Sequence, residues 1–292
     1  MDFDSDFSQL LTLALSEDIG SVGDLTSLAL VPDTAQGAAA IVARSGGIVA
    51  GALLVKPIMS AVDPHLVWEP ALEDSAVLNR GTIIGTLSGA ARGILTAERT
   101  LLNFLGRLTG IATLTRQYVD AVAGTGAKIY DTRKTTPGWR RLEKYAVRCG
   151  GGQNHRTGLY DAVLIKDNHL AQGQQGAGTF SPAEAVCRAK DFLRLRFTIL
   201  PMVQVEVDTL EQLREVLPTQ PDIVLLDNMT PAQIAEAVHI RNAVAPAVQL
   251  EASGGITLAT IRTFAETGVE RISVGALTHS AVSLDLGLDW TI

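Results

Sequence analysis

One pattern repeats six times in the second half of the chain, and it restricts the fold more than any other feature. Short apolar runs end in polar or glycine residues, and helix-like segments separate the later runs. The runs are residues 128–133, 162–168, 202–208, 222–228, 248–255 and 271–276. Strands that alternate with helices form parallel sheets, and near-continuous apolar runs are typical of strands covered on both faces. Six units predict an incomplete or distorted α/β barrel rather than a closed barrel of eight strands.

Helix signals lie between the later runs. Residues 181–193 open with Ser-Pro-x-Glu and residues 230–242 with Thr-Pro, which are N-cap residues followed by proline at the first helical position. Residues 258–268 end in glycine, as helices often do. These segments predict three helices of the α/β repeat.

The first hundred residues follow a different rhythm. Apolar residues at helical spacing predict a helix over 7–18, the stretch IGSVGDLTS reads as a loop, and strand-like runs occupy 38–51 and 82–89. A long helical pattern covers 92–122, in which Gly106 and Gly110 are expected to kink or divide the helix. This part is predicted to be a mixed α+β layer.

Polar residues gather at the carboxyl ends of the six predicted strands. They are Asp131, Arg133, Lys166, Asp167, Glu206, Asp208, Asp227, Ser253 and Gly275. Any one of them is best explained as an ordinary solvated strand end. Six successive strands that all end in this way need another explanation. The carboxyl edge of an α/β barrel, or of an open doubly wound sheet, carries the ligand site.

Charge narrows the choice of ligand. The chain has a formal net charge of -7, yet residues 131–156 contain seven lysines and arginines against two acids. The acidic total argues against a nucleic-acid partner, which requires a broad basic face, and a local cluster fits a small anion. No run reaches the roughly 20 apolar residues of a membrane span, the N-terminus lacks a signal-peptide pattern, and two cysteines form no disulfide framework. A cytoplasmic protein is therefore expected.

Five donors are expected to line one mouth of the barrel: Arg133, Lys134, His155, Arg156 and Lys166. Arginine forks and lysine point charges bind carboxylate or phosphate, and the backbone of the Gly-Gly-Gly triplet at 150–152 is expected to approach the same anion. So many donors require a ligand with several negative charges.

Two acids stand opposite these cations. Glu206 and Asp227 would repel a bare polyanion, but they are suited to binding Mg²⁺ or to accepting hydrogen bonds from sugar hydroxyls. Late glycine loops often hold phosphate in barrels, and Ser253, Gly254, Gly255 and Gly275 fit that role. The pattern predicts a phosphorylated sugar bound with a metal.

Other residues have plainer explanations. Arg140, Arg141, Lys144 and Arg148 are interpreted mainly as a solvated helix face or ion-pair partners, and Cys149 as a packing residue. No histidine and cysteine spacing supports zinc, and neither a P-loop nor a dinucleotide fingerprint occurs in the proper setting.

Several long motifs resemble one family. They are EDIGSVGDLTS, AERTLLNFLGRLTGIATLT, DTRKTTPG, LEKYAVRCGGGQNHR, YDAVLIKDNH, VQVEVD, IVLLDN, LEASGGI and ISVGALTHS, and they cover nearly the whole chain. The chain resembles quinolinate phosphoribosyltransferases. Trp139, Gln153 and the segment 171–180 depart from the family pattern, which affects loop detail only.

The resemblance implies an N-terminal α/β sandwich domain over 1–112, with the tail 281–292 packing back on it, and an irregular α/β barrel over 113–280. It implies transfer of a phosphoribosyl group from phosphoribosyl pyrophosphate to quinolinate, with Mg²⁺ and loss of CO2, in NAD biosynthesis. It also implies a homodimer, or a higher oligomer, in which each active site is shared between two chains.

Roles for single residues also follow from the resemblance. Arg133, His155, Arg156 and Lys166 are expected to bind quinolinate, and Lys134 to be shared with the pyrophosphate. Thr132 is expected to be a substrate-binding residue. Glu206 and Asp227 are expected to bind the ribose and metal, and Arg99 to reach the partner's site. Lys134, Lys166, Glu206 and Asp227 are the expected catalytic residues.

Three alternatives remain at this point. A molybdenum-transport-associated homologue shares the barrel and DTRKTTPG, although the LIKDNH motif here is intact. A Schiff-base aldolase would use Lys166 as its nucleophile. A non-catalytic protein would bind phosphoribosyl pyrophosphate without turning it over.

Overall fold

The computed structural model describes residues 4–172 and 180–291, so most of the segment 171–180 lies outside the described residues. Internal contacts divide the chain into two compact units. The first unit comprises the chain up to Arg116, Lys134–Gly152 and the chain from Ala276 onward, and the second comprises Gln117–Arg133 and Gln153–Gly275. The predicted domains, 1–112 and 113–280, are each continuous in sequence, whereas the two contact-based units are not. The predicted boundary therefore stays a prediction.

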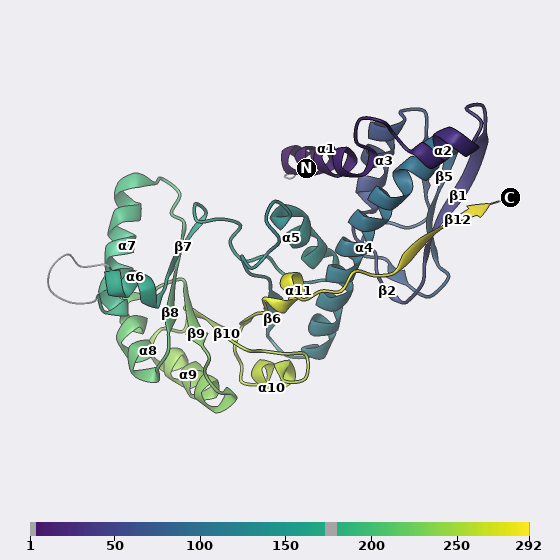
Figure 1. Ribbon diagram of the computed structural model, residues 1–292. Helices are drawn as coiled ribbons and strands as arrows, with labels where there is room; N and C mark the ends of the chain where they lie inside the picture. Colours follow the sequence, from purple (N-terminus) through teal and green to yellow (C-terminus); the bar gives the residue numbers. More distant parts are fainter. Residues whose placement is uncertain (1–3, 173–179, 292) are drawn as a thin grey trace. The chain divides into compact units, whose positions relative to one another are not determined.

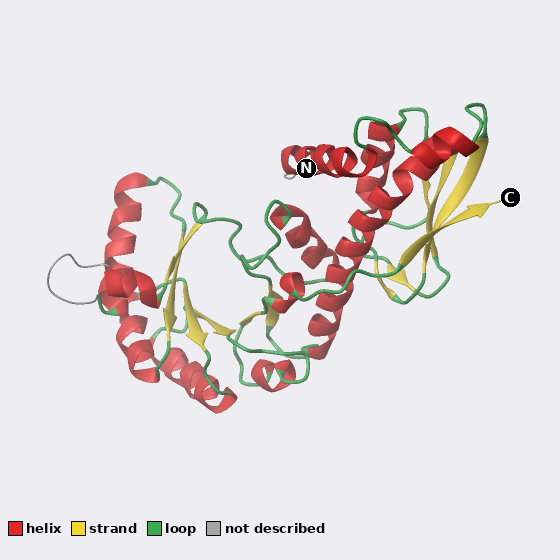
Figure 2. Cartoon of the chain, in the orientation of Figure 1, coloured by secondary structure: helices red, strands yellow, loops and turns green. Residues whose placement is uncertain are grey.

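The first unit is a mixed layer of helices and antiparallel strands (Figure 2). Its helices are α1 (Asp4–Ile19), α2 (Leu25–Leu30), α3 (Ala52–Val62), α4 (Ala91–Ala121, whose last residues belong to the second unit), α5 (Arg140–Cys149) and α11 (Ala276–His279). Its strands are β1 (Gln36–Ala43), β2 (Gly47–Ile48), β3 (Val67–Pro70), β4 (Val77–Leu78), β5 (Ile83–Ala90) and β12 (Leu286–Thr291). The main sheet has the order β12-β1-β5-β3, and β2 pairs with β4. The C-terminal strand β12 thus pairs with β1, from Ala43 opposite Leu286 to Ala38 opposite Thr291.

The second unit is built on a parallel sheet of six strands, as the sequence pattern predicts (Figure 1). The strands are β6 (Lys128–Tyr130), β7 (Ala162–Ile165), β8 (Met202–Val207), β9 (Ile223–Asp227), β10 (Gln249–Ser253) and β11 (Arg271–Ser273). Their order is β6-β11-β10-β9-β8-β7, so β6 and β7 are edge strands and the sheet does not close among the described residues. This is the incomplete barrel that six strand–helix units indicate.

Helices cover one face of this sheet, where α7 packs on β7 and β8 (Figure 1). The helices of the unit are α6 (Asp167–Gln172), α7 (Pro182–Arg196), α8 (Leu210–Val216) with the short 3-10 turn η1 (Leu217–Thr219), α9 (Pro231–Val244) and α10 (Ile261–Ala265). Capping boxes begin α7 at Ser181, α8 at Thr209 and α9 at Thr230, which confirms the predicted starts of α7 and α9. No helix among the described residues is long and apolar enough to cross a membrane.

Helices α2 and α3 of the first unit were not predicted, and neither was the short helix α11. Helix α2 begins inside the stretch that reads as a loop, because the Asp24 carboxylate accepts the Ser27 backbone N–H at 3.1 Å and caps it. Helix α3 contains Pro57, a residue that normally ends helices, yet it buries Leu54, Val55, Ile58 and Met59 at helical spacing. Burial of one apolar face therefore outweighs the local breaking signal.

The two glycines of α4 do not divide the helix, contrary to the sequence expectation. Helix α4 is continuous over 31 residues. Gly106 and Gly110 instead leave room for the segment 282–284, and the Gly106 carbonyl accepts the Leu284 N–H at 2.9 Å. A Cβ atom at Gly110 would overlap the Val282 carbonyl, and one at Gly106 would lie 2.9 Å from the Leu284 carbonyl. The glycines are required for close packing of this segment on α4.

We therefore expect Gly110→Ala to destabilise the protein. Alanine gains about 1 kcal/mol of helix propensity, but the displaced backbone of Val282 costs about 2–3 kcal/mol, the upper part of the overpacking range, so a net loss of about 1–2 kcal/mol follows. Chemical denaturation measures it as a lower unfolding midpoint. Gly126→Ala is the matched control, because its Cβ would meet nothing within 4 Å. An unchanged midpoint for Gly110→Ala would show that the 282–284 segment moves without cost.

Candidate active site

The carboxyl ends of the parallel strands bring most of the predicted site residues to one edge of the second unit. Thr132 and Arg133 follow β6, Lys166 follows β7, Glu206 lies near the end of β8, and Asp227 ends β9. Ser253 ends β10 directly opposite Asp227 in the sheet register, and Gly275 follows β11. This convergence is the arrangement that the sequence predicts.

Arg133 and Arg156 form a pair of partly buried cations. The Nε atom of each is buried and makes no hydrogen bond within the described part of the chain, while Nη1 of Arg156 donates to the Ala162 carbonyl at 3.0 Å. Burial, and next the positive charge of Arg133, lower the pKa of Arg156, and Asp161 opposes them weakly. Buried donors without acceptors are rare in folded proteins, so an anionic ligand is the natural complement of this pair.

Asp131 positions the backbone that carries His155. Its carboxylate is fully buried, accepts the His155 N–H at 2.8 Å, and accepts the Asn154 side-chain amide at 2.6 Å. The prediction that Asp131 is one of the polar groups at the mouth is wrong, because its side chain is fully buried. Asp131 orients its neighbours rather than contacting a ligand.

Two further charged residues lie inside the barrel and were not predicted. Glu251 in β10 is fully buried and accepts Nε of Arg271 at 2.8 Å, and its second oxygen lies 3.5 Å from Nε2 of His155. Nδ1 of His155 accepts the Arg156 N–H at 2.8 Å, which leaves Nε2 as the protonated nitrogen of the neutral ring. The Arg271 guanidinium also covers the Tyr130 ring at 3.6 Å. The sequence signal that could have identified both residues is a charged residue within an otherwise apolar strand run.

Lys166 and Glu206 contact each other across β7 and β8. The Lys166 ammonium group donates to the Glu206 carboxylate. Burial raises the pKa of Glu206, the hydrogen bond and charge of Lys166 lower it, and the charges of Asp227 and Asp167 raise it again, so that the pKa lies above its ordinary value. Glu206 and Asp227 are therefore close enough for their charges to interact.

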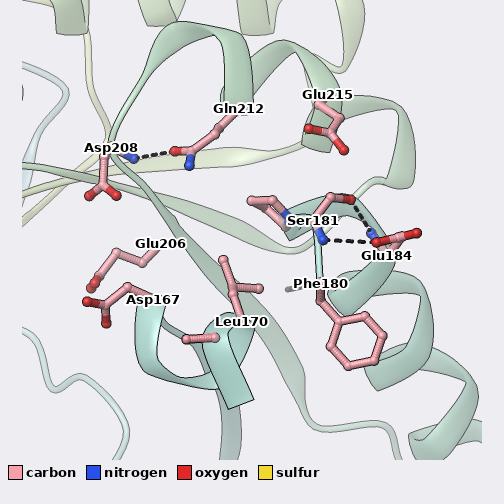
Figure 3. Close-up of a pocket in the computed structure, with 11 residues that line it drawn as sticks. Asp167, Leu170, Phe180, Ser181, Glu184, Glu206, Asp208, Gln212 and Glu215 are labelled. Carbon is pink, nitrogen blue, oxygen red and sulfur yellow. Dashed lines mark hydrogen bonds between the residues drawn. The ribbon is translucent and has the colours of Figure 1, made fainter. Parts of the chain in front are cut away.

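An acidic pocket of about 480 Å³ adjoins this pair (Figure 3). Its lining includes five carboxylates, from Asp167, Glu184, Glu206, Asp208 and Glu215. The Glu206 and Asp167 carboxylates lie side by side in Figure 3, while Glu184 is held in the capping box of α7 and Gln212 accepts the Asp208 N–H at 2.7 Å. A lining of this charge disfavours a bare anion and favours hydroxyl groups or a cation.

The turn after β10 requires glycine. Gly254 has a φ of +96° and Gly255 a φ of +60°, both in the left-handed region. A Cβ atom at Gly254 would overlap the Asn228 side chain, whereas open space surrounds the Cβ position of Gly255. The backbone at Gly255 is therefore accessible to a ligand, as a predicted phosphate loop requires.

Lys134 and Arg99 belong to the first unit, whereas the other predicted site residues belong to the second. Lys134 is exposed in the segment before α5, and Arg99 is exposed on α4. Arg133 and Lys134 are thus adjacent in sequence but fall on the two sides of the division.

The Gly-Gly-Gly triplet does not bind an anion through its backbone, contrary to the sequence expectation. The N–H groups of Gly150, Gly151 and Gly152 donate to the carbonyls of Ala146, Arg148 and Val147 at the end of α5. Cβ atoms at Gly150 and Gly152 would overlap Ala112 or Thr115 of α4. The triplet permits close packing of α5 on α4.

The basic residues of α5 are not all solvated. Arg141 pairs with Asp6 at 3.2 Å, Nε of Arg140 donates to Thr135 at 3.0 Å, and Arg148 lies over the Tyr145 ring. Lys144, however, is only 2% exposed and so is not part of a solvated face, while its alternative interpretation as an ion-pair partner stays a prediction.

An open parallel sheet that gathers charged residues at its carboxyl edge is the architecture of α/β-barrel enzymes. Residues 24–109 match the family described as "Quinolinate phosphoribosyl transferase, N-terminal domain", and residues 111–289 match the corresponding C-terminal domain. The chain therefore belongs to the quinolinate phosphoribosyltransferase family.

Curated relatives and solved structures agree with this assignment. The chain is 47% identical over 281 residues to the nicotinate-nucleotide pyrophosphorylase [carboxylating] of Mycobacterium leprae (strain TN), covering 94% of both chains. It is 43% identical to a probable enzyme of the same name from Bacillus subtilis (strain 168), covering 97% of this chain and 93% of the relative. The nicotinate-nucleotide pyrophosphorylase structure from Francisella tularensis superimposes with a TM-score of 0.88 at 38% identity, covering 98% of this chain and 96% of that one.

The charges around Glu206 give a testable order of pKa values. Lys166→Met should raise the pKa of Glu206 further, because it removes the group that lowers it, and Asp227→Asn should lower it. A ¹³C NMR titration of the side-chain carboxyls measures the shifts, and Glu206→Gln assigns the resonance. Since the folded-state pKa is raised, the contribution of Glu206 to stability is present at low pH and is lost as pH rises through that pKa. The same pKa in all three proteins would show that the groups do not interact.

Proposed function

We propose that the protein transfers the phosphoribosyl group of phosphoribosyl pyrophosphate to quinolinate. The products are nicotinate mononucleotide, pyrophosphate and CO2, which makes the reaction a step of NAD biosynthesis. The observation that carries the proposal is the pair Arg133 and Arg156, whose buried Nε atoms have no acceptor among the described residues. A dianionic pyridine dicarboxylate supplies both the missing acceptors and the missing charge. Family membership supports this reaction over an aldolase or a molybdenum-transport homologue.

The barrel residues divide into a cationic and an acidic set. Arg133, Arg156, His155 and Lys166, with Thr132, are proposed to hold the two carboxylates of quinolinate, and Lys134 to bind the pyrophosphate. Orientation by these groups would place the ring nitrogen against C1 of the ribose. Lys166 already pairs with a carboxylate, that of Glu206, so it can exchange one carboxylate partner for another.

The acids are proposed to serve the sugar. Glu206 and Asp227 would accept hydrogen bonds from the ribose hydroxyls and stabilise positive charge on the ring as pyrophosphate leaves. Ser253, Gly254, Gly255 and Gly275 would bind the 5′-phosphate, and the open backbone at Gly255 supports this role. Once the ring nitrogen carries the ribosyl group, the electron pair of the bond to the 2-carboxylate stays on C2 of the cationic ring as CO2 leaves. C2 then takes a proton from water, and no residue is needed as a base.

The residues present fit Mg²⁺ only if the substrate supplies most of its ligands. The described residues contain no cluster of three or more histidine, cysteine, aspartate or glutamate side chains able to hold a metal alone. Glu206 and Asp227 provide two carboxylates, and Mg²⁺ is typically bound by one or two carboxylates together with substrate phosphates and water. When bound, Mg²⁺ would neutralise charge on the leaving pyrophosphate.

Location and assembly are also proposals. Cys149 and Cys187 are both free cysteines, which supports a reducing cytoplasm. A homodimer, or a higher oligomer, would let Arg99 of one chain complete the site of the other. The exposed position of Arg99 on α4, which belongs to the first unit, supports this assignment.

The reaction is tested with quinolinate labelled in its 2-carboxyl group, phosphoribosyl pyrophosphate and Mg²⁺. We expect release of labelled CO2 together with nicotinate mononucleotide. Nicotinate in place of quinolinate should react at least about 10³-fold more slowly, because a buried cation then lacks its partner. Comparable turnover of nicotinate would contradict the assignment of the arginine pair to a dicarboxylate.

Mixing two inactive variants tests the shared site. Arg99→Ala and Lys134→Ala homodimers should each be nearly inactive, because each loses an anion contact in a desolvated site. After subunit exchange, one site in each heterodimer carries both changes and the other carries neither. Activity should return to about a quarter of the unmodified enzyme for random pairing in a symmetric dimer. Absence of recovery, with exchange confirmed by mass spectrometry, would show that Arg99 serves its own chain.

A further inference from the structure

Lys134 lies in a short segment that side chains from three other elements hold in place. The segment 134–137 precedes α5 and belongs to no helix or strand. A lysine is a point charge on a flexible stem, so its placement depends on the backbone that carries it. The contacts of this backbone therefore bear on the proposed pyrophosphate site.

The first contact comes from α11. Thr278 is fully buried, and its hydroxyl donates to the Lys134 carbonyl at 2.7 Å. This bond fixes the peptide that immediately follows the Lys134 side chain. It also ties the segment to a helix that begins more than 140 residues later in the sequence.

The second contact comes from α5. Glu143 is fully buried and accepts two hydrogen bonds from Thr136, one from the backbone N–H at 3.2 Å and one from the hydroxyl at 2.9 Å. Each bond uses a different oxygen of the carboxylate. The Thr136 backbone and side chain are thereby fixed together.

One guanidinium joins the two contacts. Arg107 of α4 donates from Nε and Nη2 to Glu143 at 3.2 and 2.6 Å, and from Nη2 to the Thr278 carbonyl at 2.5 Å. Its Nη1 donates to the Ala281 carbonyl at 2.8 Å. The rigid fork of arginine thus holds α5, α11 and the C-terminal segment in one hydrogen-bonded network.

We propose that Arg107, Thr136, Glu143 and Thr278 form a loop clamp that positions Lys134 and thereby sets the affinity for phosphoribosyl pyrophosphate. These are positioning residues, and none of them needs to touch substrate. The identity of the ligand rests on the proposed function, whereas the restraint on the loop does not. A buried ion pair usually contributes little net stability compared with apolar packing, so the network is better explained by the one loop conformation that it selects.

Isosteric substitutions test the clamp. Thr278→Val removes the hydroxyl that donates to the Lys134 carbonyl without changing the shape of the side chain, and Thr278→Ser keeps that hydroxyl. Thr136→Val removes the hydroxyl that donates to Glu143. We expect each valine variant to raise KM for phosphoribosyl pyrophosphate about five-fold, the effect of one lost hydrogen bond, and to leave KM for quinolinate within about two-fold. The serine variant should behave like the unmodified enzyme. Amide exchange at Thr136 should be faster in both valine variants.

Thr109→Val is the matched control. Thr109 is fully buried in the same unit, and its hydroxyl donates to the Ala50 carbonyl at 3.3 Å, away from the clamp. It should lower stability without changing either KM or the exchange at Thr136. An equal rise of both KM values in the clamp variants, or the same result for valine and serine at position 278, would overturn the proposal.

The readouts separate the clamp from the reaction. If the unmodified protein does not convert quinolinate but Thr136 exchange still rises in the valine variants, the proposed function fails and the restraint on the loop stands. If the protein is active but exchange and KM for phosphoribosyl pyrophosphate are unchanged in both valine variants, the clamp is refuted and the reaction stands.

Discussion

Parallel pairing of the strands β6 to β11 is the constraint on which the site depends. Because all six strands run in one direction, every residue at a carboxyl end meets the others at a single edge. The apolar centre of each strand supplies the stability of the barrel unit, and the ends are free to carry charge. Lys166, Glu206 and Asp227 are close for this reason, although about 60 residues separate the first from the last.

Some charged side chains inside the barrel unit have partners within the protein and others do not, and the difference bears on where a ligand would bind. Arg271 forms an ion pair with Glu251, and the carboxylate oxygens of Asp131 accept hydrogen bonds from Asn154 and from the His155 backbone. Arg133 and Arg156, in contrast, keep buried donors without acceptors among the described residues. A folded chain tolerates such donors mainly where function requires them. The unpaired donors of Arg133 and Arg156 therefore support the proposed quinolinate site.

The sequence predicts the repeating architecture well, because periodicity and capping residues report directly on strands and helices. All six parallel strands and the capped starts of α7 and α9 follow from it. It fails where a distant partner decides the outcome. Asp131 turns inward because Asn154 and the His155 backbone need an acceptor, and the glycine triplet is occupied by packing on α4. The backbone of Lys134 is likewise held by a distant residue, because its carbonyl accepts a hydrogen bond from the hydroxyl of Thr278, about 140 residues away.

The pairing of β12 with β1 has a consequence for synthesis of the protein. Arg44, next to β1, binds Asp289 in β12, 245 residues later in the chain. Until the last strand leaves the ribosome, β1 presents an open edge with unpaired N–H and C=O groups. The barrel unit, whose strands lie between residues 128 and 273, is synthesised in full before that edge is covered. The first unit to begin translation is therefore the last to complete its sheet, and its nascent edge is the part of the molecule most exposed to mispairing with another chain.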